Sequence, residues 1–251
     1  MSVTQTASST ERPSRPAARA VPIVALDVPT TESALMIVSH LGDLCHFYKI
    51  AGELFTAAGP ATVKALRDHG CDVFLDLKFH DIPNTVRGAA RSAARIGARL
   101  ISVHATGGRA MMEAAVEGAR QGAGSGTPPE VFAVTVLTSL DAATTAEAWG
   151  RPAVNVREEV HRLADLARQS GVTGIVCGGH EAAEIRQAYG DALKLLVPGV
   201  RLAGSASDDQ VRVVTPAEAV EAGASYIVVG RTVTAADAVR EAMRRVTTEI
   251  G

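Results

Sequence analysis

The sequence contains few aromatic residues, few cysteines and no long hydrophobic stretch, and each shortage argues against a class of protein. Only 4% of the 251 residues are aromatic and the basic residues form no stripe, so nucleic-acid binding has neither stacking nor electrostatic support. The longest apolar runs have the length of a strand, so we expect no membrane span. No GxGxxG motif follows the first apolar run, which argues against a dinucleotide-binding fold.

The cysteines are Cys45, Cys71 and Cys177, an odd number at wide spacing with no CxxC pair. Each lies in or beside an apolar, strand-like run. We therefore expect buried free thiols and a location in the reducing cytoplasm. The His, Cys and Asp residues show no zinc-site spacing, so we expect no resident metal.

The composition allows one large core, because 47% of the residues are hydrophobic. Residues 1–20 are rich in Ser, Thr, Ala, Pro and Arg and show no hydrophobic period, which predicts a disordered tail. This tail has no apolar stretch of the kind that a secretory signal needs. Residues 21–251 are expected to form a single catalytic domain.

From residue 21 onward, strand-like and helix-like segments alternate, which indicates the α/β class. The strand-like runs are apolar throughout, as parallel strands covered by helices are. Eight such units within this length predict a closed (β/α)8 TIM barrel, a fold that typically has about 250 residues. The expected strands are Ile23–Leu26, Phe47–Ile50, Phe74–Phe79, Leu100–His104, Val131–Leu137, Ile175–Cys177, Leu193–Val197 and Tyr226–Val229.

Two further features are expected from the sequence, a long loop after the fifth strand and a helix at the carboxyl end of the domain. A polar loop is expected from Thr138 to about Ala153, and its length for a strand-to-helix connection indicates a functional role. The last helix is expected to run from Thr234, with Met243 and Val246 among the residues that face inward.

The most informative stretch comprises residues 74–85, where a strand leads into a helix. Asp76 and Lys78 are the only polar residues of the expected strand, and at a spacing of two they share one face. Asp81 follows just past the strand, and Pro83 suits the first turn of a helix. This arrangement predicts an ammonium between two carboxylates at the carboxyl end of the strand.

One interpretation of this cluster is a structural ion pair, with Asp81 capping the following helix. Three buried charges are a poor way to gain stability, which favours a functional interpretation. Neighbouring carboxylates favour the charged form of Lys78, so this lysine suits a proton donor better than a Schiff-base nucleophile.

In a (β/α)8 barrel the carboxyl ends of all strands meet at one mouth, where the active site lies. The polar residues expected there include two lysines and an arginine, which suits an anionic substrate. Gly230 and Arg231 end the eighth strand, where a glycine admits close approach and an arginine offers a fork to phosphate oxygens. The alternative for this pair is an ordinary surface turn. The polar residues are Asp27, Lys49, Asp76, Lys78, Asp81, His104, Thr138, Gln210 and Arg231.

The motif Asp76-x-Lys78-x-x-Asp81-Ile82-Pro83-Asn84-Thr85 resembles the signature of the orotidine 5′-monophosphate decarboxylase family. The resemblance covers residues 21 to about 240; it is highly specific at this motif, whereas the phosphate motifs are shared by many barrels. Further stretches resemble the family in its order: Ala25-Leu26-Asp27, Lys49-Ile50, Val103-His104-Ala105, Val136-Leu137-Thr138-Ser139, Val197-Pro198-Gly199-Val200-Arg201, Asp209-Gln210 and Val229-Gly230-Arg231.

The resemblance implies that the chain decarboxylates orotidine 5′-monophosphate to UMP and carbon dioxide in pyrimidine biosynthesis, without a cofactor. It implies that Lys78 protonates C6 of the pyrimidine as carbon dioxide leaves, while Asp76 lies against the substrate carboxylate. It also implies a homodimer with shared sites, in which Asp81, Ile82 and Thr85 complete the site of the neighbouring subunit.

By the same resemblance, Asp27 and Lys49 hold the ribose hydroxyls, and Thr138 reads the edge of the pyrimidine. The loop from Pro198 to Gln210 is expected to close over the phosphate. The remaining expected contacts to the substrate are Arg201, Gln210, Gly230 and Arg231.

Two rivals share parts of this pattern. A metal-dependent enzyme of the same barrel group, acting on sugar phosphates as a decarboxylase or aldolase, shares the spacing of Asp76, Lys78 and Asp81. It is not expected to continue with Ile82-Pro83-Asn84-Thr85, as this chain does. A non-catalytic phosphate-binding barrel would be expected to lose the lysine or one of the carboxylates, and all three are present.

Overall fold

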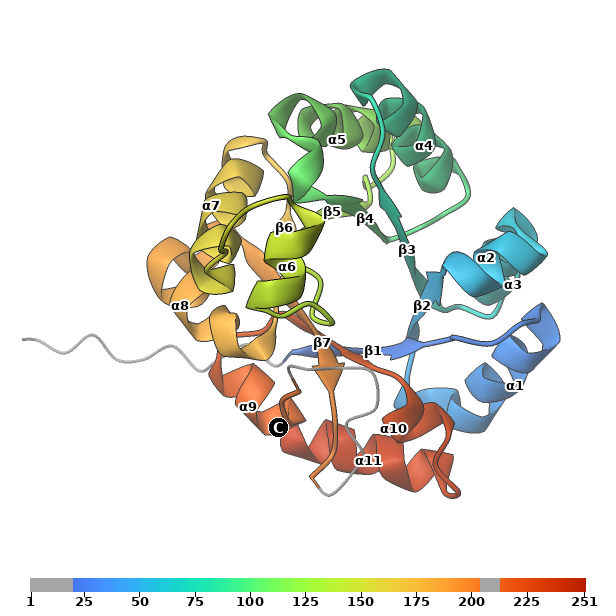
Figure 1. Cartoon of the computed structure of the whole chain (residues 1–251). Coiled ribbons are helices and arrows are strands. Elements are labelled where there is room, and N and C mark those ends of the chain that lie inside the picture. The colour runs from blue at the N-terminus through green and yellow to red at the C-terminus, as the bar shows by residue number, and fades with distance from the viewer. Residues whose placement is uncertain (1–19, 204–212) are drawn as a thin grey trace, which may run out of the picture.

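The eight expected strands form one closed parallel barrel in the computed structural model, which describes residues 20–203 and 213–251 (Figure 1). Each strand pairs with the next along the chain, and β8 pairs with β1. The predicted fold class is therefore confirmed. The strands are β1 (Val21–Ala25), β2 (Phe47–Ala51), β3 (Asp72–Phe79), β4 (Leu100–His104), β5 (Glu130–Val134), β6 (Gly174–Val176), β7 (Lys194–Val200) and β8 (Tyr226–Val229).

Helices form an outer ring around the barrel (Figure 1). Two helices rather than one follow β2, and the same holds for β5 and β8. The helices are α1 (Thr31–Leu41), α2 (Gly52–Ala58), α3 (Pro60–Asp68), α4 (Pro83–Arg95), α5 (Arg109–Ala123), α6 (Ala142–Ala148), α7 (Val156–Gln169), α8 (Gly179–Tyr189), α9 (Pro216–Glu221), α10 (Arg231–Thr234) and α11 (Val239–Glu249).

Local sequence signals set where several helices begin. Pro60 and Pro83 occupy the first turn of α3 and α4, where the missing N–H has no intrahelical partner to lose. The Asn155 side chain accepts hydrogen bonds from backbone N–H groups at the start of α7. Thr215 and Glu218 form a capping box at α9, because each side chain accepts a hydrogen bond from the backbone N–H of the other.

The hydrophobic core has two layers because successive strand residues point in opposite directions. The inner layer fills the barrel and includes Phe74, Phe132 and Tyr226, all of them buried. The outer layer lies between strands and helices, where Leu75 packs with helical residues such as Val86. Burial of each such large side chain contributes about 1.5–3 kcal/mol. Both faces of each strand are therefore covered, which explains why the strands are apolar throughout.

The amino-terminal end of the barrel carries charged side chains that pair over the aromatic layer. We call Phe47, Arg99, Glu130, Lys194 and Tyr226 the lower cluster. The Arg99 guanidinium lies 5.0 Å from the centroid of the Phe47 ring. Glu130 accepts hydrogen bonds from Lys194 Nζ at 2.8 Å and from the Tyr226 hydroxyl at 3.1 Å. Burial and the nearby Glu130 raise the pKa of Tyr226, so its hydroxyl stays a proton donor to Glu130.

Two strands end three residues away from their predicted ends, whereas the other strands end within one residue of the prediction. β5 ends at Val134 rather than at Leu137, and β7 continues past Val197 to Val200. The longer β7 includes an irregularity, because its register against β8 shifts between Val197 and Val200. Gly199 adopts a φ of 72° there, a conformation that favours glycine.

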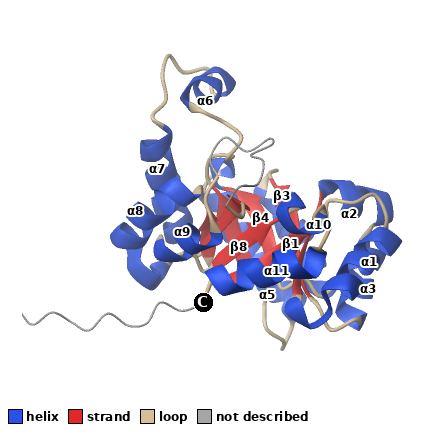
Figure 2. Ribbon diagram, turned by 90° about the horizontal axis from the view of Figure 1, so that it is seen from below, coloured by secondary structure: helices blue, strands red, loops and turns tan. Residues whose placement is uncertain are grey.

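The predicted polar loop at residues 138–153 is wrong in part, because it contains α6. This helix begins with a capping box in which Asp141 and Thr144 each satisfy a backbone N–H of the other. An aspartate is favoured at the N-cap position, so Asp141 is a sequence signal that could have predicted the start of α6. Figure 2 shows α6 standing apart from the ring of helices.

The predicted start of the last helix at Thr234 is also wrong. α10 ends at Thr234, and α11 begins only at Val239. Residues 235–238 contain neither glycine nor proline, so no local signal marks the break. The expected inward face is correct, since Met243 and Val246 are fully buried.

The hydrophobic core includes one residue of the predicted tail. Ala20, the last residue of the expected tail, is buried against the core, whereas the rest of that tail lies outside the described residues. Across residues 20–203 and 213–251, no helix combines the length and the hydropathy of a membrane span.

All three cysteines are buried, and no disulfide joins them, as the sequence predicts. Burial raises the pKa of Cys45 to about 11, so its thiol stays protonated at neutral pH. The Cys45 thiol donates a hydrogen bond to the carbonyl of Phe47, which satisfies it inside the core.

Candidate active site at the carboxyl ends of the strands

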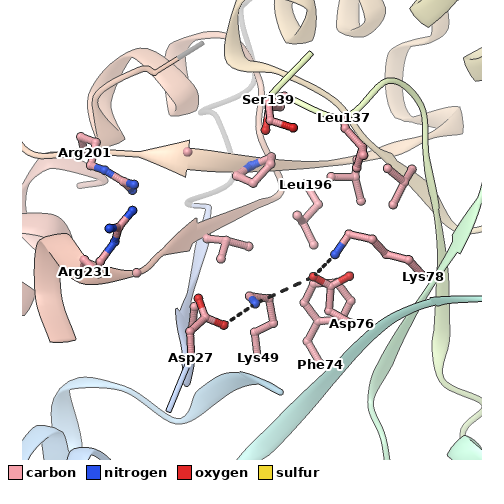
Figure 3. Close-up of a pocket in the computed structure, with 18 of the residues that line it drawn as sticks. Asp27, Lys49, Phe74, Asp76, Lys78, Leu137, Ser139, Leu196, Arg201 and Arg231 are labelled. Carbon is pink, nitrogen blue, oxygen red and sulfur yellow. Dashed lines mark hydrogen bonds and ion pairs between the residues drawn. The ribbon is translucent and has the colours of Figure 1, made fainter. Parts of the chain in front are cut away.

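A cavity of about 330 Å³ opens at the carboxyl ends of the strands (Figure 3). Phe74 and Leu196 of the inner core layer form part of its wall, and charged side chains form another part. Its volume and its mixed lining are typical of a small-molecule site. The predicted site residues that line it are Asp27, Lys49, Asp76, Lys78, Thr138, Arg201, Gly230 and Arg231.

Four of these side chains form a row of alternating charge, which we call the charged array (Asp27, Lys49, Asp76 and Lys78). Lys49 Nζ lies 3.0 Å from Asp27 Oδ1 and 3.9 Å from Asp76 Oδ2. Lys78 Nζ lies 2.8 Å from the same Asp76 oxygen (Figure 3). The middle of the row is shielded, since the Lys49 and Asp76 side chains are each 11% exposed. Fixed charges in so sheltered a place interact more strongly than they do in water.

Asp76 has a further partner that sequence reasoning missed. The Ser102 hydroxyl on β4 donates a hydrogen bond of 2.7 Å to Asp76 Oδ1, and Ser102 is fully buried. The same hydroxyl oxygen accepts a hydrogen bond of 2.9 Å from the backbone N–H of Lys78. The available signal was weak: a single polar residue among the apolar residues at the centre of a strand.

The backbone at Lys78 departs from a regular strand. Lys78 has a φ of 48° and is the only non-glycine residue with positive φ among the residues that the structure describes. The register between β3 and β4 shifts between Leu75 and Phe79, so the pairing is interrupted around Lys78. A left-handed conformation costs a residue with a side chain roughly 1–2 kcal/mol. Such strain is concentrated at functional sites, which fits the place of Lys78 in the cavity wall.

The predicted ammonium between two carboxylates is wrong for a single chain. Asp76 contacts Lys78, but Asp81 is exposed and its carboxylate accepts a hydrogen bond of 2.6 Å from the backbone N–H of Ile82. β3 ends at Phe79, and the chain then turns into α4, which carries Asp81 away from the array. Ile82 and Thr85 are exposed as well, so the structure does not bring these three residues into the cavity of their own chain.

Arg201 and Arg231 face one another across one side of the cavity, away from Lys78 (Figure 3). Arg201 follows β7, and Arg231 begins α10 directly after β8. Gly230 also lines this side, where an added Cβ would meet only Ala25 at an ordinary 3.9 Å. The predicted ligand Gln210 lies outside the described residues. Two guanidiniums with neighbouring backbone suit an anion such as a phosphate ester.

The segment after β5 forms another part of the cavity wall. Thr138 is buried, with 8% exposure, whereas Leu137 and Ser139 beside it are exposed. All three line the cavity, and Figure 3 shows Leu137 and Ser139 at its edge. Hydroxyl groups beside an apolar wall can read the polar edge of a flat ring.

Two histidine rings lie beside the array, with the centroids of His80 and His104 5.3 Å apart and the ring planes tilted by 41°. Burial lowers the pKa of His104, the charges of His80 and Lys78 act in the same direction, and Asp76 opposes them. Neither histidine is among the described residues that line the cavity. Within the described part of the chain, no group of three or more His, Cys, Asp or Glu side chains is arranged to hold a metal ion.

The fold and the site define a class of protein: a (β/α)8 barrel with a charge-alternating array and two arginines in one small-molecule cavity at its carboxyl end. The sequence profile of the Orotidine 5'-phosphate decarboxylase / HUMPS family matches residues 21–246, and the chain belongs to this family. The family resemblance predicted from the sequence motifs is therefore confirmed.

Curated relatives cover most of the chain. The orotidine 5'-phosphate decarboxylase of Heliobacterium modesticaldum is 46% identical over 230 residues, which are 91% of this chain and 94% of the relative. That of Cutibacterium acnes is 48% identical over 218 residues, 86% of this chain and 90% of the relative. The crystal structure of orotidine 5'-phosphate decarboxylase from Lactobacillus acidophilus matches with a TM-score of 0.82 at 36% identity, covering 93% of this chain and 100% of that one. The expectation of a carboxy-lyase is confirmed by these relatives.

Proposed function

We propose that the protein decarboxylates orotidine 5′-monophosphate to UMP and carbon dioxide in pyrimidine biosynthesis, with Lys78 as the proton donor. The observation that carries this proposal is the position of the charged array, which lines one cavity together with Arg201 and Arg231. Membership of the family and the names of the curated relatives support the same reaction.

Lys78 supplies the charge and the proton that this reaction needs. Loss of carbon dioxide breaks the bond between C6 and the carboxylate carbon and leaves the electron pair on C6. A fixed ammonium beside C6 stabilises this charge as it develops, which lowers the barrier more than it strengthens substrate binding. Lys78 then transfers one proton to C6, which completes UMP, and regains a proton from water.

Asp76 lies against the substrate carboxylate and orients the proton donor in this proposal. Its Oδ2 atom is 2.8 Å from Lys78 Nζ, so it fixes the position of the ammonium in the cavity wall. Two adjacent carboxylates repel each other, and loss of carbon dioxide removes one of them. The repulsion is therefore relieved as the reaction proceeds.

The phosphate of the substrate binds between Arg201 and Arg231, with Gln210 as a further ligand. Charge-assisted hydrogen bonds from two guanidiniums hold a phosphate in a defined position. The arginines lie across the cavity from Lys78 (Figure 3). The binding energy of the phosphate can therefore hold the reacting carbon against the array, which raises kcat as well as affinity.

The ribose and the base occupy the space between these two groups. Asp27 and Lys49 hold the ribose hydroxyls, and the Asp27 side chain is 56% exposed, which leaves its oxygens accessible to them. Thr138 reads the edge of the pyrimidine from the segment after β5. Gly230 leaves its stretch of backbone open to the substrate.

A homodimer completes the site in this proposal. Asp81, Ile82 and Thr85 lie outside their own cavity and are exposed, so a second subunit can receive them. Ile82 is 67% exposed, and a partner would cover this apolar side chain. The proposed location is the cytoplasm, whose reducing conditions keep buried thiols such as those of this chain out of disulfides.

The test measures UMP formed from orotidine 5′-monophosphate by the purified protein in excess chelator. Orotidine, which lacks the phosphate, is assayed in parallel. We expect turnover that the chelator does not change, and a lower kcat with orotidine as well as a higher KM. Folded protein without turnover would contradict the reaction, and metal-dependent turnover of a sugar phosphate would replace it with another activity. A higher KM alone with orotidine would contradict the role of the phosphate.

A further inference from the structure

Ser102 joins the two central residues of the charged array through a single hydroxyl. It donates a hydrogen bond to Asp76 Oδ1 at 2.7 Å and accepts one from the Lys78 backbone N–H at 2.9 Å. Ser102 is fully buried and is not among the described residues that line the cavity. We infer that Ser102 is a positioning residue, which sets the geometry of Asp76 and Lys78 without touching the substrate. This inference rests on the proposed function of the array.

The backbone around Lys78 explains why it needs this partner. β3 carries extra residues relative to β4 between Leu75 and Phe79, so the regular pairing is interrupted where Lys78 lies. A buried backbone N–H without an acceptor is costly, and the Ser102 hydroxyl replaces the missing carbonyl. The hydrogen bond thereby holds Lys78 in its left-handed conformation, with a φ of 48°.

The carboxylate of Asp76 is fixed by the same contact. Its Oδ1 atom accepts the hydrogen bond from Ser102, and its Oδ2 atom faces Lys78 Nζ at 2.8 Å. A carboxylate can rotate about its single bond to the Cβ atom, but bonds to both oxygens fix its plane. The hydroxyl therefore helps to hold the carboxylate in the rotation that keeps one oxygen toward the ammonium. Ser102 can bind the Asp76 carboxylate and the Lys78 N–H at the same time, because a serine hydroxyl is both a donor and an acceptor.

Alanine and threonine substitutions at this position separate positioning from simple packing. In Ser102→Ala we expect kcat for orotidine 5′-monophosphate to fall about 10- to 100-fold, as loss of a hydrogen bond to a charged group predicts. KM should stay within about twofold, because Ser102 does not line the cavity. Ser102→Thr keeps a hydroxyl on the same carbon and should restore most of the turnover.

Ser170→Ala provides the matched control. Ser170 is also buried, but its hydroxyl donates to the carbonyl of Leu166 at the end of α7 and contacts nothing in the array. This variant loses a buried hydroxyl in the same way, so it should lower the unfolding temperature without changing kcat. Equal losses of kcat in Ser102→Ala and Ser170→Ala would show a general effect on the fold and overturn the inference.

A spectroscopic signal tests the inference without any turnover. The lysines of the chain are Lys49, Lys64, Lys78 and Lys194, so isotope-labelled lysine gives few side-chain signals. The signal that disappears in Lys78→Ala identifies Lys78. In Ser102→Ala the Lys78 signal should shift, whereas the signal of the exposed Lys64 should not.

Because kcat and the Lys78 signal are measured independently, failure of this inference can be distinguished from failure of the proposed function. A wild type that does not decarboxylate orotidine 5′-monophosphate overturns the function, while the Lys78 signal still decides the role of Ser102. An unchanged Lys78 signal in folded Ser102→Ala overturns the positioning role. If that variant does not fold, Ser102→Cys takes its place, because a thiol has a similar shape but is a weak donor and acceptor. Wild-type kcat and an unchanged Lys78 signal in Ser102→Cys would overturn the inference as well.

Discussion

The two ends of the barrel carry similar residue types but arrange them differently. At the amino-terminal end, Lys194 pairs with Glu130 and Arg99 pairs with Asp72, and both cations lie over aromatic rings. At the carboxyl end, the charged array borders a cavity, and Asp76 is approached by two ammonium groups and a hydroxyl. We infer that the charges of the lower cluster serve stability, whereas those of the charged array serve the proposed chemistry.

The backbone shows the same contrast. Glu130, Lys194 and Tyr226 of the lower cluster each begin a strand that pairs regularly there. Lys78 at the other end has a positive φ beside an interrupted register. The local strain of roughly 1–2 kcal/mol thus lies at the end that we assign to chemistry.

The largest expected effect concerns activity at the carboxyl end. Lys78→Ala removes both the proposed proton donor and the positive charge that we place beside C6, so kcat should fall by at least about 10³-fold. Steady-state decarboxylation of orotidine 5′-monophosphate measures the loss, and thermal unfolding shows that the variant is folded. Retention of more than about a tenth of the wild-type kcat would refute the role of Lys78 as proton donor.

Substitution of Arg231 should have the next largest effect. Arg231→Ala removes one of the two guanidiniums that face the proposed phosphate position, so kcat/KM should fall about 10²-fold. Arg245→Ala is the control, because Arg245 is exposed on α11 and is not among the described residues that line the cavity. Orotidine provides a second check. Because orotidine has no phosphate, Arg231→Ala should change the kcat/KM measured with orotidine little. An equal loss of kcat/KM with both substrates would contradict the assignment of Arg231 as a phosphate ligand.

A substitution in the lower cluster should affect stability and leave catalysis unchanged. Arg99→Met keeps an unbranched apolar stem but loses the ion pair with Asp72 and the charge over Phe47. The free energy of unfolding should fall by about 1 kcal/mol, measured by chemical denaturation. The kcat should equal that of the wild type. An Arg99→Met variant with normal stability and reduced kcat would contradict the assignment of the lower cluster to stability.

The smallest expected effect is a change in pH dependence. Burial lowers the pKa of His104 in the folded protein below its ordinary value of 6.5. As the pH falls below about 6.5, the unfolded chain therefore binds a proton that the folded protein does not bind, and stability decreases. His104→Gln removes this contribution, so its loss of stability between about pH 7 and about pH 5 should be shallower. Parallel curves for the two proteins would show that His104 has no such role.

The barrel could be predicted from the sequence because each strand is covered on both faces and therefore apolar. The pairing of Asp76 with Lys78 could be predicted as well, from a spacing that places both on one face. The break between α10 and α11 could not, because residues 235–238 carry no helix-breaking residue. Tertiary packing rather than local propensity decides that boundary.

Contacts between side chains of neighbouring strands could not be predicted from the sequence either, for a different reason. Ser102 meets Asp76 because Leu75 pairs with Ile101 just before them, and the register then shifts so that the Lys78 N–H also reaches Ser102. No single segment of the sequence encodes this pairing or the shift. The direction of Asp81 depends on how the chain turns between β3 and α4. Sequence spacing gives the face of a regular strand, but it does not give the path of the chain after the strand ends.

The most direct test of the account compares Lys78→Gly with Lys78→Ala by kcat and by the free energy of unfolding. Both variants lack the ammonium, so both should be inactive by at least about 10³-fold. Glycine adopts a positive φ without the strain that alanine meets, so Lys78→Gly should be the more stable of the two by about 1 kcal/mol. That result would place both strain and chemistry at Lys78. Activity in either variant, or greater stability of Lys78→Ala, would contradict the account.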